Sequence, residues 1–166
     1  MKKDYEGKKL LDELSFEPKL AWDIFDREEQ EKAYAFADGY KEFLSQAKTE
    51  LETNKYILAK AKEYGFDAAD KAPFKLRPGA KLYFDNRGRG SALVVLGQKP
   101  ISEGFRLVGS HIDAPRLDLK ARPLYEDEGL VLLKTQYYGG IKKYQWPVQP
   151  LALHGVVVLA NGEQIT

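Results

Sequence analysis

The residues best suited to chemistry lie in the segment 107–120, whose sequence is LVGSHIDAPRLDLK. His111 and Asp113 stand two positions apart, and residues two apart in extended backbone point to the same side. An imidazole can bind a divalent metal ion while a carboxylate fixes the ring from behind. The spacing therefore indicates a metal ligand at His111 held by Asp113, although a surface histidine beside an acidic loop residue accounts for it equally well.

The other candidate ligands do not complete a metal site. A zinc hydrolase uses three protein ligands, and a two-metal site uses more. The chain has two histidines and no cysteine. The second histidine, His154, lies in an apolar run, LALHGVVVL, where a structural role is favoured over metal binding. Asp118 and the acidic residues at 126–128 form no second cluster, so these residues alone do not assemble a catalytic site.

The composition excludes several classes of protein. The 166 residues are 43% hydrophobic and 31% charged, with a net charge of +1. Such a chain is not intrinsically disordered, and its charge argues against a dedicated nucleic-acid-binding protein. The lack of cysteine excludes a disulfide framework and a cysteine nucleophile. No secretory leader or membrane-spanning run is visible, so we expect a soluble, cytoplasmic protein without a membrane partner.

The elements that must position these side chains begin with helices. Apolar residues in the first half of the chain recur at alternating spacings of four and three, which places them on one helical face. The pairs Asp26–Glu29 and Thr49–Glu52 have the spacing of a capping box. They predict one helix that begins near residue 27 and a second that begins near residue 50. Gly65 is suited to the left-handed position that ends the second helix.

Further along the chain the pattern changes to that of strands. The expected strands are 81–85, 91–97, 104–110, 117–121, 129–138 and 150–160. The turn residues at 86–90 predict a hairpin connection, and Asn161-Gly162 is a strong hairpin signal. The segment 104–110 is apolar enough to be a central strand that leads into His111. The whole pattern predicts an α/β fold in which helices cover a sheet.

An aromatic and basic segment, YYGGIKKYQW at 137–146, permits two interpretations. Alternating aromatic rings and lysines can stack bases and neutralise phosphates of a single-stranded nucleic acid. Tyrosine and tryptophan are also enriched at protein–protein contacts. We favour the protein contact, because the flanking strands are apolar and would otherwise stay uncovered.

Together these segments resemble the aspartyl aminopeptidase and vacuolar aminopeptidase I family of zinc metallopeptidases, in particular its clostridial-type members. The resemblance rests on GSHIDAPRLDLK, PLYEDEG, KTQYYGGIKKYQW and PLALHGVVV, and it extends over most of the chain. It implies that residues 1–116 are the first segment of an α/β catalytic domain, with helices packed on a mixed sheet. Residues 117–166 would be the start of an inserted β-rich dimerisation domain, which is incomplete here.

The resemblance also implies an activity. Members are aminopeptidases with two zinc ions per site, and they release N-terminal amino acids from peptides. By similarity His111 is a zinc ligand, and the catalytic Asp113 supports that ligand. The remaining ligands and the general base would lie beyond Thr166, so we expect the 166-residue chain alone to hydrolyse nothing. The family further implies a cis peptide bond between Asp113 and Ala114.

Partners follow from the same resemblance. Family members assemble into homo-oligomers through the inserted domain, and a nucleic-acid or membrane partner is not expected. The alternative from another class is a non-catalytic β-rich assembly or binding module. In that case the strands between residues 117 and 160 pair with a partner and His111 is incidental.

Overall fold

The computed structural model describes residues 2–16, 18–73 and 75–166. The chain divides into two compact units, Met1–Glu42 and Phe43–Thr166. Among the described residues we find no helix with both the length and the apolarity that a bilayer crossing requires.

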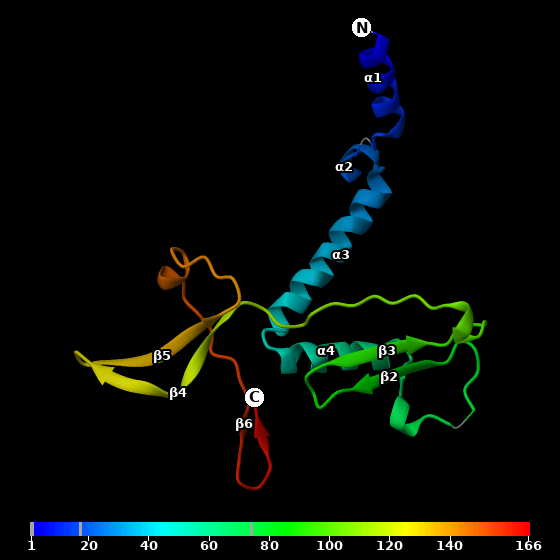
Figure 1. Cartoon of the computed structure of the whole chain (residues 1–166). Helices are drawn as coiled ribbons and strands as arrows, with labels where there is room; N and C mark the ends of the chain where they lie inside the picture. Colours follow the sequence, from blue (N-terminus) through cyan, green and yellow to red (C-terminus); the bar gives the residue numbers. More distant parts are fainter. Residues whose placement is uncertain (1, 17, 74) are drawn as a thin grey trace. The chain divides into compact units, whose positions relative to one another are not determined.

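The first unit is helical (Figure 1). It contains α1 (Lys2–Leu14), α2 (Ala21–Ile24) and most of α3 (Arg27–Gln46). The predicted capping box is confirmed at the start of α3, where the Glu29 amide donates to Asp26 Oδ1 at 2.9 Å and the Asp26 amide donates to Glu29 Oε2 at 3.1 Å. The Trp22 ring stacks on the Tyr34 ring with centroids 5.5 Å apart, which ties α2 to α3.

The second unit opens with the end of α3 and with α4 (Glu50–Glu63). A complete capping box between Thr49 and Glu52 begins α4, as predicted. The helix ends at Glu63, and Gly65, two residues later, has a left-handed φ of 76°, while the Phe66 amide donates to the Ala61 carbonyl at 2.9 Å. This is the Schellman arrangement that glycine permits without strain.

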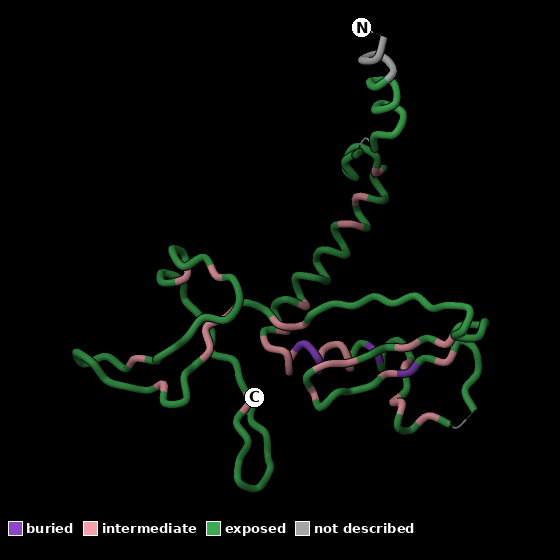
Figure 2. Tube along the Cα trace, viewed as in Figure 1, coloured by how far each residue is buried: buried purple, intermediate pink, exposed green. Residues whose placement is uncertain are grey.

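Helix α4 packs on a small mixed sheet. The strands β1 (Asp67–Ala68), β2 (Lys81–Asp85) and β3 (Ser91–Val95) lie in that order, with β1 parallel and β3 antiparallel to β2. Figure 1 shows α4 alongside β2 and β3, and Figure 2 shows the buried positions of the described chain confined to α4 and β2. They are Thr53, Asn54, Ala61 and Leu82. The predicted α/β arrangement is therefore confirmed.

A long antiparallel hairpin follows. Its strands are β4 (Arg116–Asp127) and β5 (Leu130–Tyr138), and their register pairs Arg116 with Tyr138. The register shifts between Leu119 and Leu124, which marks an irregularity in β4. The turn carries positive φ at Glu128 (50°) and Gly129 (75°), as a two-residue hairpin turn requires. The strand expected at 129–138 is thus confirmed, and the one expected at 117–121 extends further than predicted.

A second, short hairpin lies near the end of the chain. It joins β6 (Val157–Val158) to β7 (Gln164–Ile165) through the turn at Asn161-Gly162. The hairpin signal is confirmed, but the strand expected over 150–160 is reduced to the two residues that find a partner. Short 3₁₀ turns at Ala69–Lys71, Ile101–Glu103 and Trp146–Val148 complete the elements.

The strand expected at 104–110 is wrong for this structure. Residues 104–110 form no strand, and Leu107 and Val108 are 82% and 96% exposed. The reason is physical: a strand needs a neighbour to pair its backbone amides and carbonyls, and the described residues supply none for this segment. The strand expected at 91–97 likewise stops at Val95, where its pairing to β2 ends.

The cap of α4 yields a first prediction. Thr49→Ala removes the oxygen that accepts the Glu52 amide and should lower the free energy of unfolding by about 1 kcal/mol, whereas Thr49→Ser keeps that acceptor and should stay close to wild type. Urea denaturation of the three proteins measures this. Equal loss in both variants would show that the hydroxyl does not cap the helix.

Candidate functional site

The structure brings His111 and Asp113 together. His111 Nδ1 lies 2.8 Å from Asp113 Oδ1 and 3.0 Å from the Asp113 carbonyl oxygen. The same-side geometry expected from their spacing is therefore present, although the backbone between residues 104 and 115 is not part of a sheet. The His111 side chain is 82% exposed and the Asp113 side chain 35%. Within the described chain, the hydrogen bonds of the imidazole involve its Nδ1 edge.

A third side chain completes this group. The Tyr138 hydroxyl, from the last residue of β5, donates to Asp113 Oδ2 at 2.7 Å. The hydrogen bonds from Tyr138 and then from His111 hold the pKa of the Asp113 carboxyl below its ordinary value. The same contact with Asp113 raises the pKa of the Tyr138 hydroxyl. Near neutral pH the group thus consists of a carboxylate between two donors.

Sequence reasoning misses Tyr138. The residue lies 25 positions from Asp113, and only the pairing of β4 with β5 brings it near. The usable signal is the hairpin itself: once the register places Tyr138 opposite Arg116, it stands beside the end of the His-x-Asp segment.

Arg116 fastens this region to α4. Its Nε donates to Asp118 Oδ1 at 2.7 Å, and its Nη1 lies 3.1 Å from Glu50 Oε1 in the first turn of α4. Its guanidinium carbon lies 4.1 Å from the centroid of the Tyr138 ring. The pairing with Asp118 leads the interactions that raise the pKa of Arg116. One half-buried cation therefore connects α4, β4 and the tyrosine that holds Asp113.

The backbone at this point differs from one expectation. No peptide bond between described residues is cis, so the bond between Asp113 and Ala114 is trans, which corrects the family-based expectation. A cis bond before a residue other than proline costs about 2.5–4 kcal/mol and persists only where surrounding structure enforces it. Around the exposed Ala114 the described residues supply no such packing.

The donor set suits a metal ion. A histidine that binds a metal through one nitrogen commonly donates its other N–H to a carboxylate. His111 shows this arrangement, since Asp113 faces Nδ1 and leaves Nε2 for a cation. The described residues contain no group of three or more histidines, cysteines or acidic residues that could hold a metal. His111 therefore fits the role of one ligand, and the described chain does not provide a complete set.

His154 takes part in a different contact. Its Nδ1 lies 2.9 Å from Glu52 Oε1, while Glu52 Oε2 accepts the amides of Lys48 and Thr49. Burial works to raise the pKa of the Glu52 carboxyl, but the hydrogen bonds from His154, Lys48 and Thr49 outweigh it and the pKa lies below its ordinary value of 4.5. His154 thus joins the capping box of α4 to the segment before β6.

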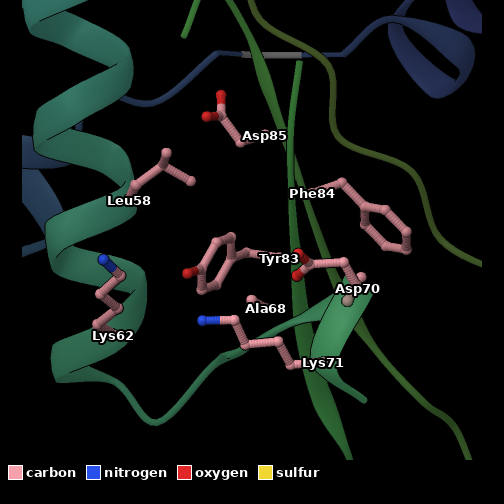
Figure 3. A pocket seen from close by; sticks show the side chains of 9 residues that line it. Leu58, Lys62, Ala68, Asp70, Lys71, Tyr83, Phe84 and Asp85 are labelled. Atoms are coloured by element: carbon pink, nitrogen blue, oxygen red, sulfur yellow. The ribbon is translucent and has the colours of Figure 1, made fainter. Parts of the chain in front are cut away.

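A separate hollow of the second unit lies away from the His111–Asp113 pair. It has a volume of about 510 Å³ and is lined by α4, β1, the 3₁₀ turn Ala69–Lys71 and β2, with Lys62, Lys71 and Tyr83 among its residues (Figure 3). Neither His111 nor Asp113 lines it. Asp70 and Asp85 balance its two lysines, so its charge favours no one class of ligand.

Comparison with known proteins assigns a family. The sequence model described as "Aminopeptidase I zinc metalloprotease (M18)" matches residues 43–166. The probable M18 family aminopeptidase 1 of Clostridium acetobutylicum is 44% identical over 153 residues, which is 90% of this chain and 33% of that protein. The protein of the same description from Borrelia garinii subsp. bavariensis is 46% identical over 145 residues, which is 87% of this chain and 31% of that protein.

Solved structures agree with the sequence matches. Aminopeptidase I from Borrelia burgdorferi B31 matches with a TM-score of 0.82 and 42% identity, over 89% of this chain and 36% of its own. The M18 family aminopeptidase from Thermotoga maritima matches with a TM-score of 0.78 and 41% identity, over 91% of this chain and 32% of its own. The chain spans about a third of the length of the curated relatives that it matches.

The loop after β5 provides a second prediction. Gly139 has a φ of 71°, and a Cβ there would lie 3.5 Å from Pro115 Cα, whereas Gly140 has open space. Gly139→Ala should lower the free energy of unfolding by about 1–2 kcal/mol because the left-handed backbone disfavours a side chain. Gly140→Ala, the matched control, should cost less. Equal unfolding midpoints in urea for the two variants would contradict the described loop.

The lowered pKa of Glu52 provides a third. Its ionised form stabilises the fold above pH 4.5, and this contribution is lost as the pH falls below 4.5 through the folded-state pKa. Glu52→Gln should therefore lower stability at pH 7 and flatten the loss of stability on the acid side. Unfolding free energies between pH 3 and 7, with the exposed Glu13→Gln as control, measure it. If the unfolding free energy of Glu52→Gln fell with decreasing pH as in the wild type, ionised Glu52 would not be a source of the acid sensitivity.

Proposed function

Because the chain belongs to the aminopeptidase I (M18) family of zinc metalloproteases, we propose that it is part of a zinc-dependent aminopeptidase that releases N-terminal amino acids from peptides. The observation that carries this proposal is the family match over residues 43–166, which includes the His111–Asp113 pair. The proposed enzyme acts in the cytoplasm, and a chain without cysteine suits a reducing compartment.

His111 and Asp113 have distinct proposed roles. His111 would bind one of two zinc ions through Nε2, while Asp113 accepts the hydrogen bond from Nδ1–H so that the ring keeps one orientation. When bound, zinc supplies Lewis acidity toward the scissile carbonyl and a water of lowered pKa. The carboxylate of Asp113 also offsets positive charge that gathers on the imidazole. The further ligands and the general base belong to parts of the family's fold outside these 166 residues.

The domain assignment belongs to the same proposal. Residues 1–116 form the first segment of the catalytic domain, and residues 117–166 begin an inserted dimerisation domain through which the enzyme forms homo-oligomers. The hairpin of β4 and β5 supports this, because a two-stranded ribbon is marginally stable alone. Its apolar side chains include Leu124, Leu130 and Val131, which are 69%, 61% and 74% exposed. A second copy of the chain would cover such side chains.

Activity of the full gene product tests the function. It should hydrolyse aminoacyl reporter substrates, lose the activity to a chelator and regain it with zinc. His111→Ala should reduce turnover at least about 100-fold, because ligand loss costs no less than loss of a supporting partner. Gln98→Ala, in an exposed loop, should leave turnover unchanged.

The 166-residue chain provides the complementary experiment. It should show no turnover with added zinc, because its described residues supply too few ligands. Chelator-sensitive turnover by this chain alone would contradict the placement of the remaining ligands outside it. A gene product that is inactive with every reporter and binds no zinc would instead favour the assembly module.

A further inference from the structure

Tyr138 closes the hydrogen-bond chain that begins at His111, and we propose that it is a positioning residue for the imidazole that binds the metal. This inference rests on the proposed function, since it takes His111 to be a ligand. It concerns a residue of β5, in the segment assigned to the inserted domain, that acts on a residue of the catalytic segment.

The argument starts from the two oxygens of Asp113. Oδ1 lies 2.8 Å from His111 Nδ1, and Oδ2 accepts the Tyr138 hydroxyl at 2.7 Å. A carboxylate held at one oxygen can still rotate about its Cβ–Cγ bond, whereas one held at both has its plane fixed. The direction of Oδ1 then fixes the imidazole through Nδ1, and so fixes where Nε2 points. Removal of the tyrosine hydroxyl would leave the carboxylate held at Oδ1 alone, so the carboxylate and the ring could reorient together, while the 3.0 Å contact of Nδ1 with the Asp113 carbonyl would limit the extent.

Tyr138 is itself held in place, as a positioning residue must be. Its backbone is paired with Arg116 across the hairpin, and the Arg116 guanidinium lies 4.1 Å from its ring centroid. Arg116 in turn is bound to Asp118 and to Glu50 of α4. These contacts use the ring of Tyr138 and leave its hydroxyl for Asp113. A phenylalanine would therefore keep the packing and lose only the hydrogen bond.

The neighbouring Tyr137 offers a matched control. Successive residues of a strand point to opposite faces, and the Tyr137 ring lies 4.2 Å from Lys143 Nζ. Tyr137→Phe removes an equivalent hydroxyl from the same strand, and the described structure gives that hydroxyl no part in the His111 contacts. A difference between Tyr138→Phe and Tyr137→Phe thus reports the contact with Asp113.

The experiment measures zinc affinity by chelator competition in the full gene product, well below the lowest melting temperature of the variants. Tyr138→Phe should weaken zinc binding about 10-fold, as loss of an outer partner typically does, while Tyr137→Phe stays within about twofold of wild type. Asp113→Asn should weaken binding at least as much. If Tyr138 acts through Asp113, adding Tyr138→Phe to Asp113→Asn should change the affinity less than about twofold.

The outcomes separate this inference from the proposed function. Wild-type affinity in Tyr138→Phe, or an undiminished effect in the Asp113→Asn background, would overturn the positioning role. The zinc affinity of His111→Ala tests whether His111 is a ligand at all. If His111→Ala weakens zinc binding and Tyr138→Phe does not, only the positioning role of Tyr138 is contradicted. If His111→Ala binds zinc like the wild type, the ligand role of His111 and the positioning role of Tyr138 are both contradicted.

Discussion

The site depends on one carboxylate that is engaged from both sides. Asp113 faces the imidazole of His111 with one oxygen and the hydroxyl of Tyr138 with the other. Both partners stabilise the ionised form, and the lowered pKa of the carboxyl is the expected consequence. A charged acceptor makes stronger hydrogen bonds than a neutral one, so the ionisation also strengthens the contacts that produce it. The orientation of His111 is thus a property of three residues from two segments of the chain.

Little of this arrangement is stabilised by an apolar core. Only Ala61 and Leu82 are buried hydrophobic residues within the part of the chain that the structure describes. Hydrogen bonds and ion pairs connect the segments instead. The Thr49–Glu52 capping box, the His154–Glu52 pair and the Arg116–Glu50 ion pair all involve the first turn of α4. This turn therefore contacts both the start of β4 and the segment before β6.

Sequence reasoning succeeds where the stabilising partner is local. The caps at Asp26 and Thr49, the left-handed Gly65 and the strand at 81–85 follow from residues within a few positions of each other. It fails at 104–110 because a strand is defined by its neighbour, which local pattern does not reveal. For the site, spacing predicts the contact of His111 with Asp113, and the metal role stays a prediction. The contact of Tyr138 with Asp113 is not predicted from the sequence, because strand register and not proximity along the chain brings the two residues together.

The exposed apolar run at Phe105, Leu107 and Val108 has a consequence for aggregation during folding. These side chains are 72%, 82% and 96% exposed, and no strand among the described residues pairs with their backbone groups. Such a run can recruit an identical run from another molecule and begin cross-β aggregation. Coverage of this run by other residues during folding would prevent such pairing. Folding order, and not equilibrium stability alone, then determines the yield of usable protein.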